Sequence, residues 1–135
     1  MAEQSWQPYW ERAEENLRAA ETLLRVTFPL SNAATSRAYY AAFHAAIALL
    51  LARTDYRPRG NEWAHDQVQA QFNIHGIRRR KLLEAKHGPT LLYLLNHRRS
   101  ADYLPRGVSQ KKAEEALKLA TGFLAAIHPL LEEQT

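Results

Sequence analysis

The segment from residue 36 to 52, SRAYYAAFHAAIALLLA, constrains the fold more than any other part of the 135-residue chain. Alanines recur through it three or four positions apart, which places them on one side of an α-helix as a ridge of small side chains. Another helix can approach such a ridge closely. The neighbouring stripe is also largely apolar, so we expect this helix to be covered on both sides. The ridge consists of Ala34, Ala38, Ala41, Ala45, Ala48 and Ala52.

Helical periodicity covers most of the remaining chain. Residues 8–27 carry apolar side chains at helical spacing, Pro8 suits a first helical turn, and Pro29 ends the pattern. Ser31 is expected to cap the alanine-rich helix, which runs to about Arg53. The later predicted elements are a helix from Glu62, capped by Asn61, to about Asn73; a break at Gly76; a helical piece from the sequence IRRRK to about Lys86; a helix from Pro89 to about Tyr103; and a helix starting at Ser109.

These patterns predict one fold class. No segment alternates like a strand, and short breaks join the helical segments without a linker or a repeat. We therefore expect an all-α protein, an antiparallel bundle of four to five helices. The length fits one domain that covers residues 1–135.

Composition excludes several classes of protein. The chain has no cysteine, so it has no disulfide framework, no cysteine-based zinc site and no thiol nucleophile. The polar, acidic N-terminal stretch does not match a secretion signal, and the longest apolar run, residues 38–52, contains His44 and is shorter than a membrane-spanning helix. We expect a cytoplasmic protein that does not associate with membranes.

The charge is unevenly distributed along the chain. Residues 53–112 carry 13 basic and 5 acidic side chains, a balance of +8, whereas the two ends together carry 5 basic and 9 acidic side chains, a balance of −4. Such a basic middle is typical of a protein with a polyanionic partner, and equally of a solvated basic surface.

Common cofactor and metal motifs are missing. The six histidines never stand three or four positions apart, so they do not form a helical metal pair, and no structural metal is expected. The five glycines are scattered rather than clustered in a phosphate loop, and no Gly-x-Ser-x-Gly occurs. We expect no cofactor.

Three polar groups remain as candidates. Arg37, Tyr40 and His44 lie along one line of the alanine-rich helix; either they line a ligand site, or Arg37 reaches solvent and its neighbours satisfy the other two. The second group lies near the end of the predicted helix from Pro89 and contains pairs of residues four positions apart. Such pairs either form weak surface ion pairs, or a carboxylate orients an arginine to bind a phosphate beside a residue that can transfer a proton. The group contains His97, Arg98, Arg99, Asp102 and Tyr103.

The third group is a run of four cations. Their side chains point around the helix, so most of them are expected in solvent, yet they can also contact a nucleic-acid backbone together with other basic residues. The run is Arg78, Arg79, Arg80 and Lys81, and the supporting residues are Arg57, Arg59, Lys111 and Lys112.

Three motifs together resemble the HEPN superfamily, in particular its small stand-alone branch. They are SRAYYAAFHAA, His65 within EWAHDQVQAQF, and RRSADY from Arg98 to Tyr103, and the resemblance covers about residues 8–131. It implies a helical bundle that dimerises, binds RNA or nucleotides or cleaves RNA, and often accompanies a small nucleotidyltransferase in toxin–antitoxin pairs. It places His65, Arg98, Asp102 and Tyr103 at the polar positions of the family, with Arg37, Tyr40 and His44 on the adjoining helix.

One position departs from the ribonuclease members of that superfamily. They resemble one another in an arginine followed a few residues later by a histidine, whereas here Tyr103 follows Arg98 and no histidine comes before His128. A tyrosine with an ordinary pKa near 10 is a poor general base at neutral pH. The sequence therefore predicts an RNA- or nucleotide-binding homodimer in a toxin–antitoxin or defence module. The alternatives are a metal-independent endoribonuclease using Arg98 with His65, His97 or Tyr103, and an adaptor for a nucleotidyltransferase.

Overall fold

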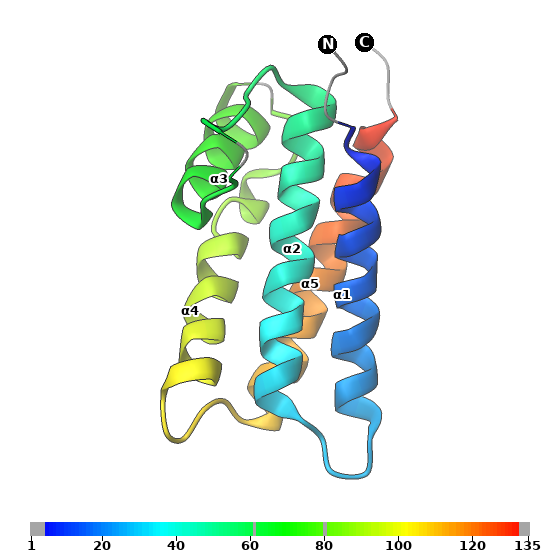
Figure 1. Cartoon of the computed structure of the whole chain (residues 1–135), viewed down its shortest axis with the longest axis vertical. Helices are drawn as coiled ribbons and strands as arrows, with labels where there is room; N and C mark the ends of the chain where they lie inside the picture. Colours follow the sequence, from blue (N-terminus) through cyan, green and yellow to red (C-terminus); the bar gives the residue numbers. More distant parts are fainter. Residues whose placement is uncertain (1–4, 61, 80, 133–135) are drawn as a thin grey trace.

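The computed structural model describes residues 5–60, 62–79 and 81–132, and within these ranges the chain forms helices and no strand (Figure 1). This confirms the predicted all-α class. None of the described helices combines the length and the apolar character needed to cross a bilayer. The elements are α1 (Gln7–Arg25), α2 (Ser31–Arg53), α3 (His65–Gln71), the π-helical η1 (Phe72–Arg79), the 3₁₀ turn η2 (Ala85–His87), α4 (Thr90–Tyr103) and α5 (Gln110–Leu131).

Helix α2 is the centre of the bundle. It packs against α1, α4 and α5, and it also contacts α3 and η1 (Figure 1). Helices α1 and α4 run opposite to α2, whereas α5 runs in the same direction as α2, so α1, α2, α4 and α5 form an antiparallel arrangement with alternating directions. The segment α3–η1 lies beside the C-terminal half of α2. Residues on α2 can therefore meet residues from every other helix.

The alanine ridge explains how three helices can crowd around α2. Ala38, Ala41, Ala45 and Ala48 have no exposed surface, which confirms the predicted close approach of neighbouring helices. Larger side chains fill the spaces on either side, and burying one of them contributes about 1.5–3 kcal/mol. The largest fully buried ones include Tyr39, Leu49, Phe72, Leu94 and Phe123.

Most helix boundaries lie within two residues of their predicted positions, but the cap of α2 and the start of α3 differ. Helix α5 begins one residue after the predicted start at Ser109, and Ser109 caps it, since its side chain accepts a hydrogen bond from the backbone N–H of Lys112 at 3.1 Å. Ser31 does not cap α2, because the helix already begins at Ser31 and the capping position is Leu30. The third helix begins at His65 rather than at Glu62, because Ala64 keeps an extended backbone. The predicted cap Asn61 lies outside the described residues.

The predicted break at Gly76 and the helical piece from IRRRK to Lys86 are wrong. The helix continues through Gly76 as the π-helical η1 and ends at Arg79. Gly76 is buried, with the ring of Phe72 and the side chain of Leu49 less than 4 Å from where its Cβ would be. Packing there outweighs the helix penalty of a glycine, about 1 kcal/mol. Lys81 then has a positive φ of 50°, which a continuing helix cannot accommodate.

Candidate functional site

Arg98 on α4 is held in place by a carboxylate that also bonds to α2. Its Nε donates a hydrogen bond of 3.0 Å to Oδ2 of Asp102, one turn later on the same helix. The Oγ of Ser36 on α2 donates to Oδ1 of Asp102 at 2.5 Å. The Arg98 side chain is only 18% exposed. Because Asp102 engages Nε, the two terminal amino groups remain available, within the described part of the chain, to bind an anion.

Two guanidinium groups lie near the ring of Tyr40. The Cζ of Arg37 lies 5.0 Å from the ring centroid, and the Cζ of Arg98 lies 5.4 Å from it. Arg98 also lies 5.9 Å from the ring centroid of Tyr103, a residue that is 72% exposed. These distances permit cation–π attraction. The arrangement joins α2 and α4 into one surface of cations and phenol rings.

Arg37 is oriented by a buried amide rather than by a carboxylate. Its Nη1 donates to Oδ1 of Asn16 on α1 at 3.0 Å, and Nδ2 of Asn16 donates to the carbonyl of Arg12 at 2.9 Å. Asn16 is buried between α1 and α2. An amide orients a guanidinium without neutralising its charge. Arg37, Arg98 and Arg99 therefore outweigh Asp102 in this region, and the balance favours an anionic ligand.

His65, the first residue of α3, pairs through Nδ1 with the hydroxyl of Tyr39 on α2. Tyr39 is 2% exposed, and burial raises the pKa of its phenol, so the hydroxyl keeps its proton. That hydroxyl makes no other hydrogen bond within the described residues, so we assign it as the donor to Nδ1. The imidazole then carries its hydrogen on Nε2.

The same ring is uncharged at neutral pH. Burial, followed by the positive charges of Arg98 and Arg99, lowers the pKa of His65, while the carboxylate of Asp66 opposes them. The ring of His65 also packs against Phe43, with 4.7 Å between ring centroids, and lies 6.2 Å from the ring of Tyr40. His65 therefore presents a neutral N–H donor beside the arginines.

His44 lies next to this group but is satisfied by its own helix. Its Nδ1 pairs with the carbonyl of Tyr40 at 2.8 Å, and its ring stacks on Tyr9 of α1 with 6.4 Å between centroids. Burial lowers the pKa of His44. The predicted line of Arg37, Tyr40 and His44 thus consists of two residues near Arg98 and one that extends the surface toward α1.

Other predicted site residues lie elsewhere. The ring of His97 stacks on Tyr93 at 4.1 Å and its Nδ1 pairs with the carbonyl of Tyr93 at 2.9 Å; among the described residues His97 forms no hydrogen bond or ring contact with the residues around Arg98. Arg99 is exposed beside them. Arg78 and Lys81 are exposed at and beyond the end of η1, away from the hydrogen bonds and ring contacts that Arg98 forms with the described residues. The side chain of Arg79 and all of Arg80 lie outside the described residues.

Sequence reasoning missed three residues that position the site: Asn16, Ser36 and Tyr39. A signal for the first two existed, because each places a polar side chain where the helical pattern requires an apolar one. Asn16 stands between Ala13 and Ala20 on the buried stripe of α1. No signal marked Tyr39, since a buried tyrosine needs a partner and only the tertiary structure shows which one it has.

The described residues contain no cluster of three histidine, aspartate or glutamate side chains that could hold a metal ion. Asp102 is engaged by Arg98 and Ser36, and His65 by Tyr39. The groups left free around Arg98 are N–H donors, which bind anions rather than cations.

Comparison with known proteins places the chain in a family. The model of the HEPN domain matches residues 6–130. A protein of Methanocaldococcus jannaschii named "Putative toxin MJ0605" is 33% identical over 123 residues, which are 91% of this chain and 86% of the relative. The match includes all the helices that form the site.

Proposed function

Because the chain belongs to the HEPN domain family, we propose that it is a toxin-type member that binds single-stranded RNA, with a phosphate held by Arg98. The observation that carries this proposal is the Arg98–Asp102–Ser36 chain of hydrogen bonds. A guanidinium fixed through Nε loses little conformational freedom when its terminal amino groups bind a phosphate in a bidentate manner. The name of the archaeal relative supports the toxin assignment.

The surroundings of Arg98 suit RNA better than a free phosphate ion. Single-stranded RNA is commonly bound by aromatic rings that stack on bases and by cations that follow the backbone. Tyr103 is largely exposed next to Arg98, and Arg37, Tyr40 and Arg99 extend the surface. Arg98 can hold a phosphate while Tyr103 stacks on an adjacent base.

His65 is the reason for considering RNA cleavage as a second candidate function. Its lowered pKa keeps the imidazole neutral at pH 7, the form that a proton acceptor needs. However, the hydrogen bond from Tyr39 occupies Nδ1 and leaves the hydrogen on Nε2. In that form His65 donates to a phosphate oxygen rather than accepting the proton of a ribose 2′-hydroxyl. The geometry therefore favours binding over cleavage.

Fluorescence anisotropy with a labelled, single-stranded RNA oligonucleotide tests the binding proposal. Arg98→Ala should weaken affinity about tenfold or more, as expected for the loss of a charge-assisted bidentate contact. It should also lower the slope of log K against log salt by about one charge. Arg18→Ala is the matched control, because Arg18 is exposed on α1 beside a hollow lined by Trp10 and His128. Equal losses of RNA affinity in Arg98→Ala and Arg18→Ala, or no RNA binding by the wild type, would refute the proposal.

Incubation of the same RNA with wild-type protein in excess chelator separates binding from cleavage. Intact RNA, together with measurable binding, supports a binding protein. Fragments that disappear with both Arg98→Ala and His65→Ala would establish the endoribonuclease instead. A mononucleotide added as competitor then shows whether one phosphate and one base are enough for recognition.

The partners belong to the same proposal. We infer a homodimer and a neutralising partner, a small nucleotidyltransferase, from the family resemblance and the toxin name of the relative. Exposed apolar side chains support a protein contact: Phe28 in the α1–α2 turn is 84% exposed, and Leu30 and Leu104 are also exposed. Light scattering coupled to size exclusion tests the dimer, and a monomer at micromolar concentration would contradict it. Action in the cytoplasm remains part of this proposal.

A further inference from the structure

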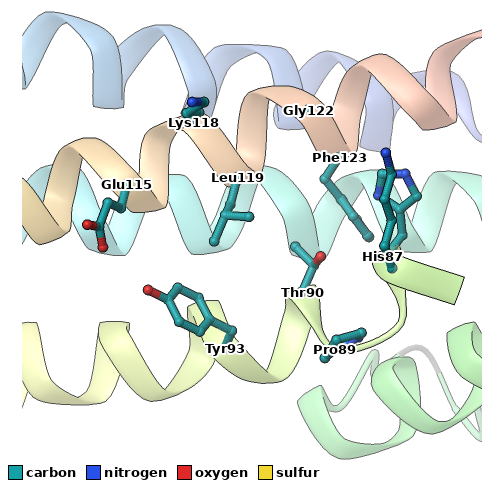
Figure 2. A pocket seen from close by; sticks show the side chains of 10 residues that line it. His87, Pro89, Thr90, Tyr93, Glu115, Lys118, Leu119, Gly122 and Phe123 are labelled. Carbon is teal, nitrogen blue, oxygen red and sulfur yellow. The ribbon is translucent and has the colours of Figure 1, made fainter. Parts of the chain in front are cut away.

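Helices α4 and α5 leave a hollow between them that the proposed RNA site does not use. It has a volume of about 690 Å³ and is lined from both helices and from η2. Figure 2 shows Thr90 and Tyr93 of α4 opposite Leu119 and Phe123 of α5, with His87 and Pro89 toward one end. Arg37, Tyr40, His65 and Arg98 do not line it. Its volume falls in the range of roughly 300–1,000 Å³ that is usual for small-molecule sites.

Gly122, in the wall of this hollow, is a glycine that neither the backbone conformation nor helix packing requires. Gly122 lies in the middle of α5, where glycine is less favourable than alanine. Its φ is not positive, and a Cβ built on it would meet no atom within 4 Å. Neither backbone conformation nor close helix packing therefore requires glycine there. Its effect is to keep the hollow open above Phe123 and beside Leu119.

The charges at the rim favour an anionic group. Lys86 and Lys118 line the hollow; Lys86 pairs with Glu84 at 3.7 Å, whereas Lys118 forms no ion pair among the described residues. The one carboxylate in the lining, Glu115, is paired with Lys112 at 3.6 Å. His87 adds a further donor, since burial and the neighbouring charge of Lys86 lower its pKa and keep it neutral. The two ion pairs balance each other, so Lys118 leaves a net positive charge at the edge of an apolar floor. This arrangement fits a molecule with an apolar body and one acidic group.

We propose that the hollow between α4 and α5 binds a small amphipathic carboxylic acid. The apolar body lies over Gly122 between Tyr93, Leu119 and Phe123, and the carboxylate lies at the rim near Lys86 and Lys118. The ligand is separate from RNA, and both can be bound at once because the two sites share no residue among those described.

Titration with dansylaminoundecanoic acid, whose fluorescence rises in apolar surroundings, tests this site. Wild-type protein should bind the acid about three- to tenfold more tightly than its uncharged methyl ester. Gly122→Leu should abolish binding because the new side chain enters the hollow, while its melting temperature should equal or exceed that of the wild type. Ala125→Leu is the matched control, since Ala125 lines the hollow with Trp10 on the α1 side of α5.

The charge contribution is tested separately. Lys86→Gln/Lys118→Gln should bring affinity for the acid down to that for the ester and leave ester binding unchanged. Equal binding of acid and ester by the wild type, equal binding by Gly122→Leu and Ala125→Leu, or no binding at all would overturn the proposal. The proposal would also be overturned if the wild type did not bind the probe and Gly122→Leu changed the oligomeric state. That result would show that the hollow holds a second copy of the chain. RNA affinity should not change in any of these variants.

Discussion

The hydroxyl of Ser36 donates a hydrogen bond of 2.5 Å to the carboxylate of Asp102, which stands 66 positions further along the chain. The same carboxylate accepts from Nε of Arg98 at 3.0 Å. This pair joins the start of α2 to the end of α4 and fixes the direction of the guanidinium. Four predictions, beyond the tests above, concern this site and the core beneath it.

Asp102→Asn should weaken both the link between α2 and α4 and the binding of RNA. The amide keeps one acceptor and loses the charge, so Arg98 becomes more mobile. The free energy of unfolding should fall by about 1 kcal/mol, and RNA affinity by about three- to tenfold. Urea unfolding and anisotropy measure the two effects. Asp55→Asn, which makes the same change at an exposed loop position, should alter neither, and equal effects of the two substitutions would contradict the role given to Asp102.

Tyr39→Phe should release the imidazole of His65. The substitution keeps the buried ring and removes only the hydroxyl, so the expected loss in unfolding free energy is about 0.5–1.5 kcal/mol. RNA affinity should fall about two- to fivefold, because the hydrogen is no longer held on Nε2 of His65. Tyr56→Phe is the control, since Tyr56 has a ring contact with Trp63 and its hydroxyl forms no hydrogen bond with the part of the chain that the structure describes. Unchanged affinity in Tyr39→Phe would remove His65 from the binding site.

Stability should decrease as the pH falls below neutrality. The pKa values of His44, His65 and His87 are lowered in the folded protein, mainly by burial, whereas the unfolded chain has histidines near 6.5. Between the folded and unfolded pKa values the unfolded chain binds more protons, so the stability present above about pH 6.5 is progressively lost on acidification.

Urea unfolding at pH 7.5 and pH 5.5 checks this dependence. The unfolding free energy should be lower at the acidic pH, and His65→Gln should reduce the difference between the two values. His128→Gln, at an exposed position of α5 where the ring stacks on Trp10, controls for the loss of an imidazole as such. Equal stability at both pH values would show that burial does not disfavour the protonated rings.

Ala41→Leu should destabilise the bundle through overpacking. Ala41 has no exposed surface on the ridge of α2, and extra methylene groups there force neighbouring helices apart at a cost of about 1–3 kcal/mol. Ala33→Leu makes the same change at an exposed position of α2 and should cost less than about 0.5 kcal/mol. Thermal and urea unfolding compare the two. A fully tolerated Ala41→Leu would mean that the ridge does not set the distance between helices.

The helical architecture could be predicted because its signals are local. The spacing of apolar residues fixed which side of each helix is buried, and proline and glycine marked most of the ends. The prediction failed between Gly76 and Lys86, where packing of Gly76 on Phe72 and Leu49 overrides the local preference of glycine. Such a contact joins residues that are distant in sequence, so no local pattern reports it.

In the candidate site, too, some features follow from spacing along the chain and others only from the packing of the helices. The sequence by itself determined that Arg37 and Tyr40 share one line of a mostly apolar helix and that Arg98 shares a helix face with Asp102, since helical periodicity depends only on spacing along the chain. Only the tertiary structure decided that Asp102 bonds to Ser36, that Asn16 orients Arg37, that Tyr39 pairs with His65, and that His97 stacks on Tyr93 instead. The physical reason is that hydrogen bonds and stacking act over a few ångströms, and which side chains come that close is set by how the helices pack.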